Sequence, residues 1–365
     1  MKANDNKKKQ FLLHRAKKME RIRMLYKQYK KEANRRRNSD NGRQYPSISE
    51  YASRAKKTSD RYDTVIEVPE VFSLMKEPDI AVSFISKVEK ALNNGQTTFI
   101  DMSNVKELAD GALVVLLSSM IKFKSNNIKF NGNFPDDEKV RASLVRSGFF
   151  DQLYGTHGIK EQDSYSFTQN RIFTHANKIV DSRLSSEIIK SMSRLIWKED
   201  RRCPGVQRAF LELMQNTNNH ADKNKNGVHH WWTTVSYNQE ENKACFSFID
   251  YGIGITQSIY NDDRSRLHKV LDFIQRTFNP QHDADLLELL LKGKIHSSTG
   301  MYYRGKGLPG IFAANRDNKL SNLVVISNKA KADVSKNLYI QLDKDFSGTF
   351  VYWELSDKNE SIKNV

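Results

Sequence analysis

A row of polar side chains at four-residue spacing is the strongest constraint in this chain. It occupies the segment "FLELMQNTNNHAD" at 210–222 and consists of Glu212, Asn216 and His220. In an α-helix four residues advance about 400°, so the three side chains lie in one row with a drift of about 40° per step. The apolar residues beside the row predict a buried face: Phe210, Leu213 and Met214. A polar row at the margin of an apolar face predicts a helix that lines a cleft.

The composition indicates an ordinary globular chain with more than one domain. Its 365 residues are 38% hydrophobic and 28% charged, which is enough for two cores and a tail. The longest apolar run, at 112–121, has about half the length needed to cross a bilayer, and no apolar segment follows the charged N-terminus as in a secretory signal. Cys203 and Cys245 lack metal-ligand spacing. We therefore expect two buried thiols, no membrane contact and a cytoplasmic location.

The positive charge is concentrated in the first segment of the chain. Residues 1–60 contain 19 Lys and Arg against 6 Asp and Glu, so they hold +13 of the net charge of +16. Residues 1–38 are rich in helix formers, and 38–60 resembles a linker. We expect a basic helical arm that can neutralise the phosphates of nucleic acid, or a solvated tail without a specific partner.

Strand and helix patterns alternate between residues 61 and 155, which predicts a small α/β domain. The order resembles the STAS domains of anti-sigma-factor antagonists, in which a loop before a helix carries a phosphorylated serine. The corresponding loop here is "ADGA" at 109–112, and Asp110 stands where the serine is expected. The resemblance implies a protein partner for this domain, but the missing hydroxyl argues against phosphorylation at that position.

A polar segment at 156–184 is predicted to connect this domain to a second one at 185–365. Helical patterns precede and contain the polar row, two strand patterns follow at 229–238 and 243–252, and three more end the chain. Between them, 256–304 is long for a connection and contains at least two helical patches.

Three short motifs of the second domain suit a nucleotide. In "IDYGIGI", Asp250 at a strand end can accept a hydrogen bond from an exocyclic amine, and two glycines allow a close approach of the backbone to a flat ring: Gly252 and Gly254. In "RGKGL", the backbone before a helix suits a phosphate chain, and two basic side chains add charge. These residues are Arg304, Gly305, Lys306, Gly307 and Leu308. In "SGTF", Thr349 lies on the last strand pattern.

The order of these motifs resembles the GHKL superfamily of ATP-binding domains, which includes gyrase-type topoisomerases, heat-shock chaperones, sensor histidine kinases and anti-sigma-factor kinases. The resemblance covers about 185–357. It implies the Bergerat fold, an α/β sandwich in which ATP is held between helices and a mixed sheet. The overall fold class expected is therefore α/β (α+β), with the basic arm, the STAS-like domain and a C-terminal Bergerat-fold sandwich.

The resemblance also implies a role for each member of the polar row. Asn216 is expected to give its amide oxygen to Mg²⁺, which bridges the phosphates, and Glu212 to orient or deprotonate the attacking water or hydroxyl. His220 is expected to contact phosphate or ribose. Asp250 is expected to select adenine, and 256–304 to form the ATP lid or an additional helical subdomain.

Three functions remain open from the sequence. The first is a Mg·ATP-dependent ATPase that acts as a regulatory switch, with nucleic acid as one candidate partner. The second is a serine/threonine protein kinase of the anti-sigma-factor type, because no phosphoacceptor histidine of the sensor-kinase pattern occurs in the chain. The third is a non-catalytic ATP-binding module that holds nucleic acid through the arm. The oligomeric state is open, and a homodimer is compatible with the sequence.

Overall fold

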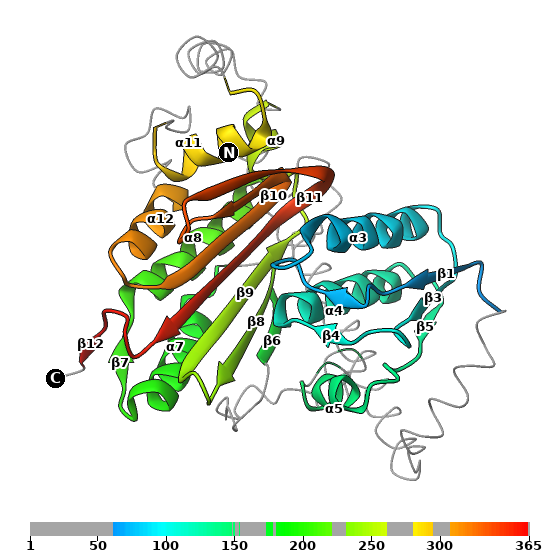
Figure 1. The fold of residues 1–365 in the computed structure, drawn as a ribbon, viewed down its shortest axis with the longest axis horizontal. Coiled ribbons are helices and arrows are strands. Elements are labelled where there is room, and N and C mark those ends of the chain that lie inside the picture. The colour runs from blue at the N-terminus through cyan, green and yellow to red at the C-terminus, as the bar shows by residue number, and fades with distance from the viewer. Residues whose placement is uncertain are drawn as a thin grey trace, which may run out of the picture. The chain divides into compact units, whose positions relative to one another are not determined.

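The computed structural model describes a chain in which residues Ala55–Val365 form one compact unit (Figure 1). The described residues are 61–147, 149, 153, 173–177, 180–220, 231–260, 280–294 and 307–363. The expected basic arm at 1–60 lies outside them. Among the described helices, none is both long and apolar enough to span a membrane. Cys203 and Cys245 are buried free thiols, as predicted.

The N-terminal part is an α/β layer, which confirms the alternation predicted for 61–155. Its strands β1 (Thr64–Glu67), β3 (Thr98–Asp101) and β5 (Phe130–Gly132) form a parallel sheet in the order β1-β3-β5. A second parallel pair joins β2 (Val71–Phe72) to β4 (Glu107–Leu108). The helices are α3 (Pro78–Asn93), α4 (Asp110–Ser125) and α5 (Glu138–Arg146). Pro78 suits the first turn of α3, and the Asp137 carboxylate caps α5 by accepting from the Lys139 and Val140 amides.

The C-terminal part contains a five-stranded sheet in the order β10-β11-β9-β8-β6. These strands are β6 (Phe173–Asn177), β8 (Trp231–Asn238), β9 (Lys243–Asp250), β10 (Ser321–Asp333) and β11 (Leu338–Ser356). Every pairing among them is antiparallel, so the expectation of a mixed sheet is wrong. Hairpin turns join β8 to β9 and β10 to β11. Strands β6, β9 and β10 therefore run in one direction, and β8 and β11 run in the other.

Two details of this sheet depart from the sequence prediction. The edge strand β6 lies inside the segment 156–184, which we expected to be a connector, and it pairs with β8. Strand β11 is a single strand of 19 residues, whereas the sequence suggested two. Its register against β10 shifts around Ser327 and Asn328, so the strand bends there without a break in the chain.

Three helices cover one face of the five-stranded sheet: α7 (Ser182–Trp197), α8 (Pro204–His220) and α12 (Gly307–Arg316). Phe210 of α8 meets Trp353 edge-on at 5.1 Å, and Trp353 stacks on Phe246 at 5.3 Å. Trp231 is fully buried and stacks on Phe248, so it packs in the core of this face. The short strands β7 (Arg201–Arg202) and β12 (Ile362–Lys363) pair beside these helices.

The opposite face of the same sheet is covered by α3 and α4, which lie between the two sheets (Figure 1). Helix α4 contacts β8 and β9 on one side and β5 on the other, and all of its residues from 111 to 120 are buried. At Gly111 a Cβ atom would come within 2.6 Å of the Phe350 ring. Helix α4 is apolar on every side because it packs against two sheets.

Candidate functional site

Helix α8 contains the polar row, and the side chains of Glu212 and Asn216 are described. Phe210, Leu213 and Met214 are buried against the sheet. Glu212 is about one quarter exposed, with its side chain 27% accessible, and Asn216 is partly exposed. The side chain of His220, the third member, lies outside the described residues. The row therefore borders the apolar face of α8.

The beginning of α12 lies against two members of this row. A Cβ atom at Gly307 would come within 2.8 Å of the Glu212 Oε2 atom and 3.7 Å of the Asn216 Nδ2 atom. The absence of a side chain at Gly307 thus lets the first turn of α12 approach α8 closely. The first amides of a helix have no partner within it and suit an anion. The structure brings Glu212, Asn216 and Gly307 together, although 95 residues separate Glu212 from Gly307.

Arg208 lies one turn before Glu212 and contributes to the same contact. Its Nε atom is 3.8 Å from the Glu212 Oε1 atom, and its guanidinium covers the backbone of Gly310, where a Cβ atom would come within 2.4 Å. Gly310 therefore permits the helices to approach each other at a second point. The sequence reading did not single out Arg208, but its spacing of four residues from Glu212 was a detectable signal.

Asp250 is the last residue of β9 and is 7% exposed. It lies opposite Thr349 on β11, and its Oδ1 atom accepts a hydrogen bond of 2.9 Å from the Gly252 amide. Burial raises the pKa of Asp250 to about 6. The Gly252 amide and the hydroxyls of Thr349 and Thr217 act in the opposite direction and lower this pKa, but by less than burial raises it.

Thr217 connects Asp250 to the polar row, because it is the neighbour of Asn216 on α8. Its hydroxyl lies within reach of the Asp250 carboxylate and also donates to the Leu213 carbonyl at 3.0 Å. Consecutive helix positions differ by about 100°, so Asn216 projects from the same turn in a neighbouring direction. One turn of α8 thus borders both Asp250 and the beginning of α12. Thr217 was missed by the sequence reading.

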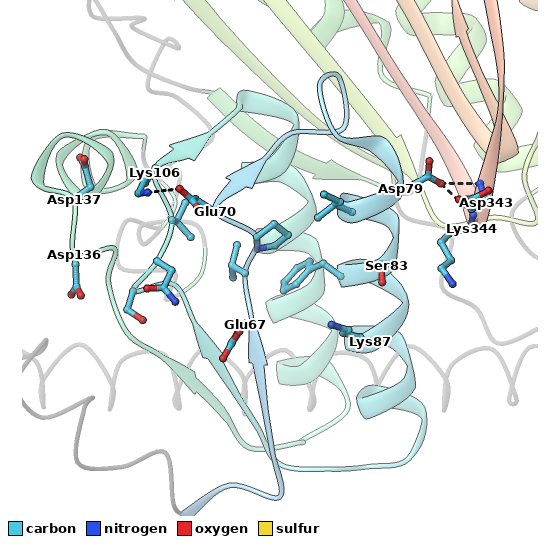
Figure 2. Close-up of a pocket in the computed structure, with 17 residues that line it drawn as sticks. Glu67, Glu70, Asp79, Ser83, Lys87, Lys106, Asp136, Asp137, Asp343 and Lys344 are labelled. Atoms are coloured by element: carbon cyan, nitrogen blue, oxygen red, sulfur yellow. Dashed lines mark hydrogen bonds and ion pairs between the residues drawn. The ribbon is translucent and has the colours of Figure 1, made fainter.

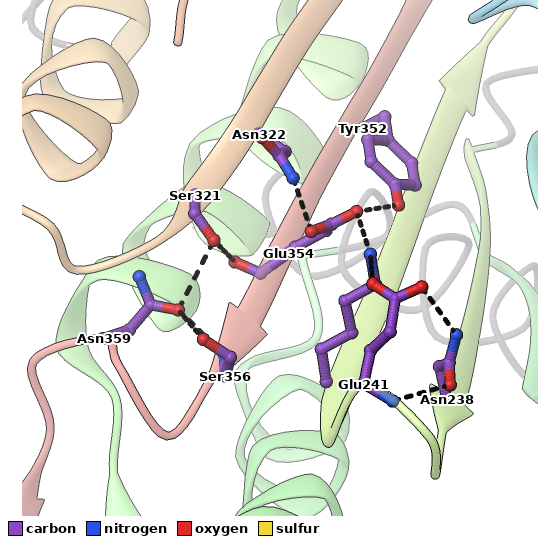
Figure 3. A network of polar contacts seen from close by, with 9 residues as sticks. Asn238, Glu241, Ser321, Asn322, Tyr352, Glu354, Ser356 and Asn359 are labelled. Carbon is purple, nitrogen blue, oxygen red and sulfur yellow. Dashed lines mark hydrogen bonds and ion pairs between the residues drawn. The ribbon is translucent and has the colours of Figure 1, made fainter.

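A second buried carboxylate on the same pair of strands gives a comparison for Asp250. Glu354 of β11 accepts hydrogen bonds from Lys243, Tyr352 and Asn322 at 3.1, 2.6 and 2.6 Å (Figure 3). Its charge is therefore balanced by a lysine. Within the described ranges no Lys or Arg forms an ion pair with Asp250, which has only neutral donors. A buried carboxylate without a cation is typical of a binding site.

The turn after Asp250 is held by two residues of β10 that the sequence reading also missed. The Asn328 Oδ1 atom accepts from the Thr256 amide at 3.1 Å and the Thr256 hydroxyl at 2.9 Å, and its Nδ2 atom donates to the Ile253 carbonyl at 3.0 Å. Ser327 accepts from the Ile255 amide at 2.8 Å and donates to the Gly348 carbonyl at 2.6 Å. Both residues lie where the register between β10 and β11 shifts.

Glycines allow these close approaches around Asp250. Gly254 has a φ of +82°, and a Cβ atom there would come within 2.2 Å of Asn328. A Cβ atom at Gly348, which has a φ of +148°, would come within 2.2 Å of the Asp250 carbonyl oxygen. Only glycine adopts these conformations readily, so the "DYGIG" and "GT" motifs have a local structural reason in this fold. Gly252, the third glycine, donates its amide to Asp250 as described above.

The remaining predicted site residues are only partly described. Arg304, Gly305 and Lys306 lie outside the described residues, while Leu308 begins α12 with Gly307 and packs at the edge of the core. The described residues contain no cluster of three or more His, Cys, Asp or Glu side chains suited to a metal. The Mg²⁺ ion expected at Asn216 would take its other ligands from phosphates and water.

The described parts of 256–304 are packed helices. Helix α9 (Ile255–Tyr260) and α11 (Asp283–Leu291) share a small apolar cluster of Ile255, Ile259, Leu286, Leu289 and Leu290. Helix α11 is tied to the hairpin of β10 and β11, because Asp283 accepts from the Lys329 amide and Gln341 accepts from the Ala284 amide, both at 3.2 Å. The packing of these two helices is compatible with the additional helical subdomain expected for 256–304. The other parts of the segment expected to form the lid, 261–279 and 295–304, lie outside the described residues.

A separate cleft of about 920 Å³ lies in the N-terminal layer (Figure 2). It is at the carboxyl ends of β1, β3 and β5, and its charged lining includes Glu67, Asp136 and Lys87. At one side Asp79 of α3 accepts from the amides of Asp343 and Lys344 at 2.9 and 3.3 Å, which joins α3 to β11. None of the predicted nucleotide-site residues lines this cleft.

No protein-family model, no curated protein and no solved structure matches this chain.

Proposed function

We propose that the chain binds Mg·ATP between α8 and the ends of β9 and β11, and that ATP turnover makes it a regulatory switch. The observation that carries the proposal is the position of α8. One turn of this helix borders both the buried Asp250 carboxylate and the first turn of α12. Helix α8 therefore contacts both motifs that are expected at opposite ends of a nucleotide, that of Asp250 at the base and that of Gly307 at the phosphates.

The chemistry of each group supports an assignment along the nucleotide. Asp250 and Thr349, at the buried end, offer an acceptor and a hydroxyl to the exocyclic amine of adenine. The beginning of α12, at Gly307 and Leu308, offers backbone amides to phosphate. Asn216 is the group that would hold Mg²⁺ through its amide oxygen, and the metal would supply positive charge to the phosphates.

Glu212 is assigned as the general base. Its Oε2 atom lies beside Gly307, where the terminal phosphate is expected, so a water or hydroxyl that approaches this phosphate can lose a proton to the carboxylate. Arg208, with its Nε atom at 3.8 Å, holds the carboxylate in this orientation. The same geometry serves hydrolysis and transfer to a protein hydroxyl, so the protein-kinase function remains the second candidate.

Two substitutions on α8 test the assignment, and the fate of a radiolabelled γ-phosphate separates the candidate functions. We expect Asn216→Ala to abolish Mg·ATP binding in calorimetry. We expect Glu212→Ala to retain binding and lower turnover by about 10²- to 10⁴-fold, the usual contribution of a general base. Label in free phosphate indicates an ATPase, and label on a protein indicates a kinase. Label that stays in ATP indicates a binding module. Unchanged turnover in Glu212→Ala removes that residue from the mechanism.

A further inference from the structure

Tyr251 links the proposed nucleotide site to the N-terminal layer. It follows Asp250 directly, and successive residues at a strand end point to opposite faces of the sheet. Asp250 faces α8, whereas the Tyr251 hydroxyl lies 2.6 Å from the Ser118 hydroxyl of α4. The Lys122 ammonium group lies 3.2 Å from the centroid of the Tyr251 ring. Neighbouring residues therefore contact the site on one face and α4 on the other.

The contact between Tyr251 and α4 is enclosed on several sides. Ser118 is fully buried, and Phe346 packs edge-on against the tyrosine ring at 6.3 Å. Lys122 lies 3.8 Å from Glu89 of α3, and burial lowers the pKa of Lys122 to about 8. An attraction between a cation and an aromatic ring is stronger where water is excluded. The ring of Tyr251 is therefore held in one position by α3, α4 and β11.

The backbone transmits this position to Asp250. A Cβ atom at Gly348 would come within 2.2 Å of the Asp250 carbonyl oxygen and 3.2 Å of the Tyr251 Cα atom. There is little free space between β11 and this part of the chain. A displacement of the Tyr251 ring consequently shifts the backbone on which the Asp250 carboxylate is mounted.

A second connection reaches the same turn from the N-terminal layer. Asp345 of β11 accepts a long hydrogen bond of 3.4 Å from the Asn328 Nδ2 atom. Burial raises the pKa of Glu89 of α3 against the opposing effect of Lys122, and the charge of Asp345 adds to the rise. Asn328 in turn holds the amides of Thr256 and Gln257. Both connections run from α3 and α4 to the segment 250–257.

We propose that Tyr251 is a positioning residue that couples adenine-nucleotide affinity to the packing of α4 against the sheet. The inference rests on the proposed function and adds its regulation. A shift of α4 that breaks the contact between Tyr251 and Ser118 weakens nucleotide binding, and nucleotide binding opposes that shift by the same factor, because coupling between two equilibria is reciprocal.

The test compares two variants that remove the hydroxyl pair, Tyr251→Phe and Ser118→Ala, with their double mutant. The readout is the Kd of a non-hydrolysable ATP analogue with Mg²⁺ in the full chain. Each single variant should bind about three- to tenfold more weakly, as expected for one lost hydrogen bond. The double mutant should bind no more weakly than either single variant, because both remove the same contact.

Tyr352→Phe is the matched control, because Tyr352 lies on the same face of the sheet and donates to Glu354 at 2.6 Å, away from the site. It should lower Tm and leave the Kd unchanged, which separates positioning from general destabilisation. Wild-type affinity in both Tyr251→Phe and Ser118→Ala overturns the coupling while leaving nucleotide binding intact, and so does an equal loss in Tyr352→Phe. A wild-type chain that binds no adenine nucleotide overturns the proposed function, and the coupling with it.

Discussion

Replacing Asp250 by asparagine should stabilise the fold while it impairs the site. Burial raises the pKa of Asp250 from 3.8 to about 6, so the native state disfavours the charged form. Each pKa unit corresponds to about 1.4 kcal/mol, so above pH 6 the ionised carboxylate costs about 3 kcal/mol that a neutral amide avoids. The hydrogen bonds that favour a carboxylate here reduce the gain, and we expect Asp250→Asn to raise the free energy of unfolding by about 1–3 kcal/mol at pH 7.5.

The pH dependence of this difference follows from the same shift. Between pH 4 and 6 the native state binds more protons at Asp250 than the unfolded state does. Stability from this group therefore falls as the pH rises through that window. The advantage of Asp250→Asn should disappear below pH 4, where both states of the wild type are protonated. Urea unfolding of the wild type and of Asp250→Asn at pH 7.5, 5 and 3.5 measures this difference in the free energy of unfolding.

Glu354→Gln provides a matched control with the opposite sign. Glu354 is equally buried, at 7% exposed, but pairs with Lys243 at 3.1 Å. A neutral side chain at this position attracts the lysine less strongly, and we expect the free energy of unfolding to fall by about 1–3 kcal/mol at pH 7.5.

In calorimetry, Asp250→Asn should bind the ATP analogue at least about tenfold more weakly, because a hydrogen bond to a charged acceptor is lost. The reasoning is refuted if Asp250→Asn is less stable than wild type at pH 7.5, or more stable but with unchanged affinity.

Two further substitutions test the packing around the site. Gly111→Ala should lower the free energy of unfolding, measured in urea, by about 1–3 kcal/mol, because the added Cβ atom would overlap the Phe350 ring. Alanine favours helix more than glycine does, so a gain in stability would contradict this contact. Asn328→Ala should cost about 2–4 kcal/mol, since it leaves buried amides at the turn unpaired and places alanine at a φ of 52°. Asn328→Gly should recover about 1 kcal/mol of this loss, because glycine adopts the positive φ without strain but does not restore the hydrogen bonds. Hydrogen exchange at 253–257 should rise in both variants; unchanged exchange there contradicts the role of Asn328 in holding the turn.

The sequence predicted the elements of the N-terminal layer well because each carries a strong local pattern. Helix α3 has apolar residues on one side and a proline in its first turn, and Ser103 and Asn104 follow β3 closely. The same sequence did not reveal where this layer packs. The apolar run in α4, interrupted only by Ser118 and Ser119 between 112 and 121, was the available signal, because a helix buried on all sides must contact two layers.

The arrangement of the C-terminal sheet depended on contacts that no local pattern encodes. Strand β6 has polar neighbours and was absorbed into a predicted connector, and its strand state depends on pairing with β8. Strand β11 appeared to be two strands because the polar stretch around Asp343 and Asp345 interrupts its alternation. The structure continues through that stretch because α3 supplies partners, as Asp79 does for the Asp343 amide.

The candidate site was predictable where residue type and spacing coincide with chemistry, as at Glu212, Asn216 and Asp250. The residues that position these groups were not, since Thr217, Ser327 and Asn328 belong to common types without a distinctive spacing. Their function is visible only when distant chain segments come together, as Ile255 and Ser327 do across 72 residues.

The most direct measurement of the central claim is a calorimetric titration of the full chain with a non-hydrolysable ATP analogue in the presence of Mg²⁺, with the corresponding GTP analogue as the matched control. We predict one adenine nucleotide bound per chain and at least about tenfold weaker binding of guanine, because Asp250 and Thr349 are expected to bind the exocyclic amine at C6 of adenine, where guanine carries a carbonyl oxygen. Absence of binding by both nucleotides, or equal binding of both, would contradict the account.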